Sequence, residues 1–269
     1  MKVEKILFIT QEITPFVPAS PIGTYGQNLL QGIQDKVKEI RTFTPLWGNI
    51  NTRRNNLHEV IRLSGMNLII DDTDHPLIIK VASLQSARMQ VYFIENEDYF
   101  HNRLMTIDEN GKEYEDNDER TIFFNLGVIE AIKKQRWCPE IIHCCGWMSA
   151  LAPLYLRSAY KDEPSFRDSK IVISLFDESY NEPFNEEFAR KLLCKDMSMD
   201  NLEGMTIPTT YNDLAKLAIR NCDGVIMSGD NIAPELIEYA KEQGKAILPK
   251  QAAEEAENNT YDFYSSLFE

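Results

Sequence analysis

Three features are scarce in this 269-residue chain, and each scarcity excludes a class of protein. Lysine and arginine together number 28 against 42 aspartates and glutamates, which leaves a net charge of −14. Nucleic acids and anionic membrane surfaces are bound through clustered cations, so we expect neither as a partner. Apolar runs fall short of the ~18 residues of a membrane span. The first ten residues, interrupted by Glu4 and Lys5, are not a secretion signal and predict a buried strand.

Cysteine is the third scarce feature. The five cysteines are Cys138, Cys144, Cys145, Cys194 and Cys222, an odd number without the spacing of a disulfide framework. This usage predicts a reducing compartment, and we expect the cytoplasm. No second ligand pair completes a zinc site, so we expect no metal and no cofactor. Nothing near the adjacent pair marks the base that a nucleophilic cysteine needs.

Short apolar, β-branched segments alternate with segments of helical periodicity along most of the chain. The predicted strands are Lys5–Thr10, Glu39–Pro45, Val60–Leu63, Ile78–Ser83, Met89–Ile94, Glu140–His143, Ile171–Leu175, Gly224–Met227 and Ala246–Leu248. The predicted helices are Thr24–Lys36, Glu119–Gln135, Met148–Tyr160, Tyr211–Asn221 and Asn231–Gln243. This order predicts an α/β fold with a Rossmann-like, doubly wound and mostly parallel sheet. Between Val60 and Ile94 strand follows strand across polar links such as "DDTDHP", which predicts an antiparallel β-meander inserted at the sheet edge.

The chain divides unevenly into a domain and a tail. We expect one domain over residues 1–250 and a C-terminal tail over residues 251–269. Residues Ala252–Asn259 are polar and acidic, which predicts that the tail leaves the core. Its aromatic end, "TYDFYSSLF", predicts a short helix that docks back.

The loop after the first strand is the first candidate site. A strand, a loop and a helix N-terminus in this order often hold phosphate. Here only Gly23 and Gly26 are present, Pro18 and Pro21 lack a backbone N–H, and the loop holds no lysine or arginine. A turn followed by a helix N-cap at Thr24 is the favoured interpretation.

A second candidate is the acidic stretch "YEDNDER". Asp116 to Glu119 are typical of a helix N-terminus, where carboxylates are stabilised. Arg120, one turn into the helix, either contacts a ligand or pairs with these acids.

Two further candidates follow predicted strands directly. In "IIHCCGWMS", His143 lines a cleft or lies in the core, and Trp147 offers a flat face to a sugar or packs in the interior. In "ISLFDESY", Asp177 and Glu178 are paired carboxylates of the kind used in glycosidic chemistry. Residues adjacent in sequence seldom converge on one substrate atom, which disfavours that role.

Taken in order, these stretches resemble the N-terminal domain of bacterial glycogen synthases and plant starch synthases, glycosyltransferase family 5. "ILFITQEITPFV" is similar to the family's opening "ILFVTSEVAPFV", and "TPLWGNI" to "LPRYG". "VYFIENEDYFHNR" and "YEDNDERTIFF" resemble "YFIDNPEYFDR" and "YxDNxERFxFF". "PEIIHCCGWMSALAPLYLR" resembles "PDIVHCHDWHTALLPLYLK", and "VISLFDESYNEPF" resembles "VFTIHNLAYQGVF". The resemblance runs from residue 4 to about residue 240.

The resemblance implies the N-terminal half of a GT-B glycosyltransferase, in which two Rossmann-like halves face each other across a cleft. The family transfers glucose from ADP-glucose or UDP-glucose to an α-1,4-glucan with retention of configuration and without a metal. Sugar nucleotide and α-glucan are therefore the implied ligands. The candidate cleft or sugar-binding residues are Gly23, Asp116, Asn117, Arg120, His143, Trp147, Asp177 and Tyr180, and no residue is assigned as catalytic.

The sequence departs from the family's pattern where the chemistry sits. The lysine beside the donor phosphate falls at Pro18, and the following glycines and aspartate fall at Ser20, Pro21 and Thr24. In the "HDWH" motif the first histidine falls at Cys145, the aspartate at Gly146 and the second histidine at Met148, while the "HN" pair falls at Phe176 and Asp177. Removing one electrostatic partner of a transition state costs roughly 10²–10³ in rate. Losing several together is expected to abolish transfer.

Three functions follow as expectations. The first is a synthase-like domain, inactive alone, that binds glucan or regulates a true synthase, with Glu269 close to where the family's interdomain hinge begins. The alternative is an active glucosyltransferase subunit completed by a protein partner that supplies the second Rossmann-like domain. The third, least favoured, is a sugar hydrolase that reuses His143, Asp177 and Glu178.

Overall fold

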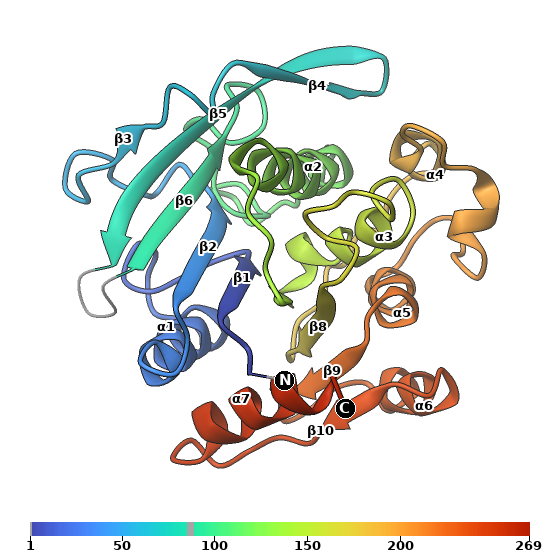
Figure 1. Cartoon of the computed structure of the whole chain (residues 1–269). Coiled ribbons are helices and arrows are strands. Elements are labelled where there is room, and N and C mark those ends of the chain that lie inside the picture. The colour runs from blue at the N-terminus through green and yellow to red at the C-terminus, as the bar shows by residue number, and fades with distance from the viewer. Residues whose placement is uncertain (1, 85–88) are drawn as a thin grey trace.

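The computed structural model describes residues 2–84 and 89–269, and it places a large sheet between two layers of helices (Figure 1). The strands are β1 Lys5–Thr10, β2 Glu39–Pro45, β3 His58–Glu59, β4 Met66–Ile70, β5 Thr73–Leu84, β6 Met89–Glu95, β7 Ile141–Cys145, β8 Lys170–Leu175, β9 Gly224–Met227 and β10 Ala246–Leu248. The helices are α1 Pro21–Ile33, α2 Asn117–Gln135, α3 Ala152–Arg157, α4 Phe188–Leu192, α5 Tyr211–Asn221, α6 Pro234–Glu242 and α7 Ala256–Ser266.

The strand order confirms the predicted fold class. It is β10-β9-β8-β7-β1-β2-β6-β5-β3, with β4 paired to β5. All pairs from β10 to β6 are parallel, and β5 pairs in antiparallel fashion with β6, β3 and β4. Parallel strands joined by helices on both faces form the doubly wound sheet that the sequence predicts, and the antiparallel strands form the inserted meander at its edge.

The register shows which helices cover which face. Phe8, His143, Val172 and Gly224 are partners across β1, β7, β8 and β9, so their side chains share one face. A β-carbon at Gly224 would touch Phe263 of α7, and Gly26 of α1 lies against Phe8. Helices α1 and α7 therefore lie side by side on this face, while α2, α3 and α5 cover the other (Figure 1).

The meander differs in detail from the prediction. The predicted strand Val60–Leu63 is wrong: these residues form a turn in which the Leu63 N–H donates to the Val60 carbonyl at 2.8 Å. Strand β4 was not predicted, and β5 begins at Thr73, inside the "DDTDHP" link. Only Asp71 and Asp72 form the turn, both with positive φ (48° and 63°), as a two-residue hairpin requires. Aspartate tolerates this conformation, so the segment predicted as a polar link is in fact a tight turn between two strands.

Two helices also differ from prediction. Helix α1 starts at Pro21, not at Thr24, because the Ser20 hydroxyl accepts the Gly23 N–H at 2.9 Å as the N-cap. The predicted helix Met148–Tyr160 is broken into a 3₁₀ turn at Trp147–Ser149 and the six-residue α3. Pro153 is tolerated there because it stands in the first turn of α3, where its missing N–H costs nothing.

The aromatic end of the chain forms α7, as predicted, and it is bonded into the core. Tyr264 is fully buried, and its hydroxyl lies 2.6 Å from Nδ1 of His143, whose Nε2 lies 2.8 Å from the Ser174 hydroxyl. Burial lowers the pKa of His143 to about 3, so the imidazole is neutral and both nitrogens are satisfied by neutral partners. This contact holds α7 to β7 and β8.

Replacing Tyr264→Phe is expected to lower the free energy of unfolding by about 1–3 kcal/mol, because one imidazole nitrogen of His143 loses its partner in the core. Urea unfolding followed by circular dichroism measures the change. The matched control is Tyr261→Phe, on the same helix, whose hydroxyl makes a long 3.3 Å contact to the Val3 carbonyl at the surface. Equal losses in the two variants would contradict the anchoring role of Tyr264.

Candidate functional site

The candidate site lies at the carboxyl ends of three neighbouring parallel strands, β1, β7 and β8. Open α/β sheets bind their ligands at this edge. The segments that follow the strands contribute Gln11 and Glu12 after β1, Gly146 to Met148 after β7, and Glu178 shortly after β8. We call this group of residues the strand-end site.

Gln11 fills the centre of the strand-end site. Gly146 has φ +82°, and a β-carbon there would lie 2.4 Å from the Gln11 side chain. The Gln11 side-chain oxygen accepts the Met148 N–H at 3.3 Å, and its backbone oxygen accepts the Trp47 indole N–H at 2.6 Å. The place where the family's pattern has an aspartate therefore holds a glycine under the side chain of Gln11.

Met148 is held in the interior and away from any open surface. It is fully buried, the Thr121 hydroxyl donates to its sulfur at 3.1 Å, and the Asn125 amide donates to its carbonyl at 2.7 Å. A thioether carries no charge and is a weak hydrogen-bond acceptor. The side chain at the position of the family's second histidine thus packs against α2.

Glu178 brings a buried carboxyl to the same place. Burial is the main cause that raises its pKa to about 8, and the neighbouring Glu12 carboxyl adds to it, while the Trp147 N–H and the Gln11 side chain act in the opposite sense. Its Oε2 has no hydrogen-bond partner within residues 2–84 and 89–269. Glu12 is itself only 6% exposed, and burial raises its pKa as well. These surroundings favour the protonated, neutral form of Glu178 at neutral pH.

The space left beside Glu178 is very small. A cavity of about 20 Å³ lies between Gly146, Trp147, Ser174, Glu178 and Tyr211. This volume holds about one water molecule, which would have polar neighbours there. A hexose does not fit into this cavity.

The two adjacent carboxylates Asp177 and Glu178 do not act on one centre. Asp177 is exposed and accepts the N–H groups of Asp230 and Asn231 at 2.8 and 2.6 Å, which ties β8 to the loop after β9. Glu178 points into the interior instead. This divergence leaves no paired acid and base of the kind that a glycosidase uses.

The two aromatic residues that match the family's motifs pack on each other. Trp147 and Tyr180 are 5% and 8% exposed, with ring centroids 5.1 Å apart. Tyr180 also stacks on Phe184 at 4.6 Å, and its hydroxyl donates to the Thr209 carbonyl at 3.1 Å. These rings hold the segment after β8 against the strand-end site, and their faces are covered by protein.

Residues of the "YEDNDER" stretch hold the loop between β6 and α2. Arg120 is fully buried, and it donates to the carbonyls of Tyr99 and Leu104 and to the Asn117 side chain, each within 2.8 Å. Asp116 accepts two hydrogen bonds of 2.6 Å from Arg103. Burial lowers the pKa of Arg120 to about 9, and nearby Arg103 adds to this. The expected pairing of Arg120 with the acids is wrong, because its hydrogen-bond partners are two backbone carbonyls and an amide oxygen, and Asp116 pairs with Arg103 instead. Contact of Arg120 with a ligand stays a prediction.

Gly23 and His143 lie apart from the strand-end site. Gly23 stands in the first turn of α1, where a β-carbon would come within 3.0 Å of the hydroxyls of Thr14 and Ser20. It allows the loop after β1 to pass close to the helix. His143 points to the α1 and α7 face of the sheet.

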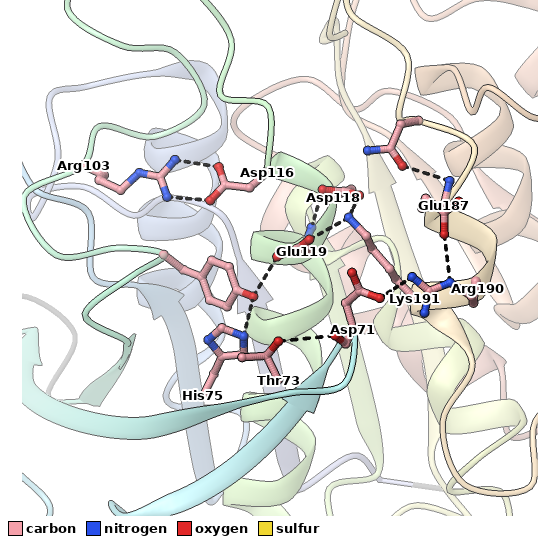
Figure 2. A network of polar contacts seen from close by, with 12 residues as sticks. Asp71, Thr73, His75, Arg103, Asp116, Asp118, Glu119, Glu187, Arg190 and Lys191 are labelled. Carbon is pink, nitrogen blue, oxygen red and sulfur yellow. Dashed lines mark hydrogen bonds and ion pairs between the residues drawn. The ribbon is translucent and has the colours of Figure 1, made fainter.

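A charged network on the α2 side links segments that are distant in sequence (Figure 2). Lys191 of α4 bonds Asp118 and Glu119 at the start of α2, at 3.0 and 2.6 Å, and all but 8% of its side chain is buried. Glu119 accepts the Tyr99 hydroxyl at 3.0 Å, and that hydroxyl also contacts His75 of β5. Arg190 pairs with Asp71 of the β4–β5 turn. The network fixes α4 and the hairpin to the body of the domain.

Sequence reasoning missed Gln11, Glu12 and Lys191 as parts of these arrangements. Gln11 and Glu12 directly follow β1, and this position at the end of a parallel strand was the one sequence feature that could have indicated them as site residues. Lys191 lies in a segment without clear periodicity, so nothing in the sequence indicated its partners. Within residues 2–84 and 89–269, no three His, Cys, Asp or Glu side chains gather as metal ligands, and no helix is long and apolar enough to cross a membrane.

Comparison with solved structures defines the class of protein. The catalytic domain of starch synthase IV from Arabidopsis thaliana, solved with ADP and acarbose, matches 93% of this chain and 51% of that chain with a TM-score of 0.72. The sequences are 15% identical over this match, so the likeness shows the fold. The chain has the architecture of one Rossmann-like half of a GT-B glycosyltransferase.

Comparison with known sequences defines the family. The model of the starch synthase catalytic domain matches residues 5–248, and the chain belongs to this family. Glycogen synthase from Pelodictyon phaeoclathratiforme is 37% identical over 172 residues, which cover 64% of this chain and 35% of that protein. Glycogen synthase from Chlorobaculum tepidum is 30% identical over 235 residues, 87% of this chain and 47% of that protein. The chain thus spans less than half the length of these relatives.

Replacing Glu178→Gln is expected to stabilise the protein increasingly as the pH rises from about 4.5 to 8. The unfolded carboxyl ionises near pH 4.5 and the folded one near pH 8, so rising pH favours the unfolded state across this window. The difference between variant and parent should be near zero at pH 4 and reach on the order of 4–5 kcal/mol at pH 8. Urea unfolding at several pH values measures it, with the exposed Glu182→Gln as control. A constant difference across the window would contradict the buried, protonated state.

Replacing Lys191→Met is expected to lower the free energy of unfolding by about 3–5 kcal/mol, because Asp118 is 1% exposed and would lose its cation. The neighbouring Arg190→Met is the matched control. Its side chain is 54% exposed, and its loss should cost less than about 1 kcal/mol. Chemical unfolding of the two variants measures both losses of free energy. Similar losses would show that the buried network does not hold α4.

Proposed function

We propose that this chain is a glycogen- or starch-synthase-like domain that does not itself transfer glucose and acts in the cytoplasm as a glucan-binding or regulatory protein of glycogen metabolism. One observation carries the proposal. In the strand-end site the Gln11 side chain packs against Gly146, Met148 is fully buried against α2, and the cavity beside Glu178 holds about one water molecule. A glucosyl group has no place among these residues.

Electrostatics support the same conclusion. In transfer from a sugar nucleotide, negative charge collects on the leaving diphosphate, and a competent site places cations there. The positions that the resemblance gives to the lysine and the second histidine hold Pro18 and Met148. The ionisable groups that the structure does bring to the strand-end site are the carboxyls of Glu12 and Glu178. Neither carboxyl offers a diphosphate a counter-charge.

A glucan remains a suitable ligand because it is neutral. The net charge of −14 disfavours polyanions and leaves uncharged carbohydrate as a compatible partner. The starch synthase IV structure holds ADP and acarbose, an observation that belongs to that protein and that supports a sugar ligand for this fold.

The second candidate is an active glucosyltransferase subunit completed by a partner with a second Rossmann-like domain. Its support is the 37% identity to glycogen synthase over 172 residues. It differs from the first candidate in one testable respect: a purified C-terminal half of a related synthase would restore transfer.

The purified chain, given ADP-glucose or UDP-glucose with a radiolabel and glycogen as acceptor, is expected to incorporate no label. The loss of two charged partners predicts a rate at least about 10⁴-fold below that of a competent synthase. The Chlorobaculum tepidum glycogen synthase, assayed in parallel, shows that the conditions support transfer. Glycogen co-sedimentation of the same preparation is expected to retain the chain.

Label transferred by the chain alone would overturn the proposal. Transfer that appears only after addition of a separate C-terminal half would establish the second candidate. Absence of both transfer and glycogen binding would remove the glucan-binding role and leave regulation through a synthase.

A further inference from the structure

A cavity of about 520 Å³ opens between the start of α1 and the segment that runs from residue 250 into α7. Figure 1 shows these two helices side by side, with the end of β9 next to them. The cavity is separate from the strand-end site, and its walls come from segments more than 200 residues apart in the sequence. We call it the α1–α7 cavity. Its volume lies in the range of small-molecule sites.

The lining combines an apolar floor with uncharged polar groups at the rim. Leu29 of α1 and Ile226 and Met227 of β9 form apolar surface. Thr24 and Asn28 stand one turn apart on α1, and both are exposed. Gln251 lies on the opposite wall, where its amide is bonded to the Pro249 carbonyl and to Asn259. Amides and hydroxyls around an apolar face are the groups that recognise a sugar ring, which has an apolar face and a border of hydroxyls.

The charges around the cavity disfavour an anion. Lys250 is the cation of the lining, and its ammonium is paired with the exposed Asp230 carboxylate at 2.5 Å. Glu257 brings a carboxylate to the opposite wall. At the start of α1 the Gly23 N–H is already bonded to Ser20, and Pro21 has no N–H to offer. A phosphate would meet one paired cation, one carboxylate and an occupied helix terminus.

We propose that the α1–α7 cavity binds the end of a neutral α-glucan chain, with Asn28 and Thr24 bonding its hydroxyls and the apolar floor packing against its rings. This inference rests on the glucan-binding role proposed above and names the site for it. Because the ligand would contact both α1 and the segment that leads into α7, it would hold the C-terminal helix in place. Glucan binding and docking of α7 are therefore coupled.

Calorimetric titration of the full chain with maltopentaose tests the proposal. Ala253→Trp is expected to abolish binding because residue 253 lines the cavity and the indole would fill it. Ala252→Trp is the matched control, since Ala252 is exposed and adjacent to Ala253 but does not line the cavity. The pair Thr24→Val with Asn28→Leu keeps the volume and removes the bonding groups, and it should weaken binding by about tenfold or more. Maltopentaose should also slow hydrogen exchange of the amides in α7.

The outcomes separate this inference from the proposed function. If Ala253→Trp and Ala252→Trp bind maltopentaose equally well, the glucan site lies elsewhere and the inference fails, while the glucan-binding role stands. If the parent chain binds neither maltopentaose nor glycogen, that role fails together with the site. Displacement of bound maltopentaose by inorganic phosphate or ADP at millimolar concentration would overturn the assignment of a neutral ligand.

Discussion

The neutral imidazole of His143, bonded on both sides, is the contact on which much of this structure depends. It stands in the middle of β7 on a face that needs a covering layer, and burial removes its charge. A buried imidazole needs a partner for each nitrogen, and Ser174 and Tyr264 supply them. Through Tyr264 the contact brings the last helix of the chain against the sheet. The same helix then forms one wall of the α1–α7 cavity. The hydrogen bond between Tyr264 and His143 in the core therefore positions the wall of the cavity in which we place a ligand.

The strand-end site is closely packed, and it lies on the sheet scaffold of the family. The parallel sheet keeps its order, and the segments after β1, β7 and β8 still meet. The glycine at position 146 removes a side chain, and Gln11 takes up the space. The fold of the starch synthase catalytic domain is thus present together with close packing of Gln11 over Gly146.

Several residues that match the family's motifs are engaged in holding the protein together. Arg120 satisfies three acceptors of the loop between β6 and α2, and Asp116 holds Arg103 in a two-bond pair. Trp147 and Tyr180 pack on each other beneath the segment after β8. A motif match identifies the family through such residues, because they maintain the shape of the site whether or not a substrate enters it.

The sequence by itself predicted the parallel strands, most of the helices, the presence of an edge meander and the resemblance to the family. These follow from local periodicity and from motifs whose residues lie close together along the chain. Tertiary structure alone decided where Gln11, Glu178 and His143 point, because each is placed by partners more than 100 residues away. It also decided that the Asp71–Asp72 link is a two-residue turn and that the helix predicted from Met148 breaks, because strand pairing and burial of Met148 against α2 override local preference. The cavity between α1 and α7 could not be predicted from the sequence either. Its two walls are far apart along the chain, and only the complete sheet brings them together.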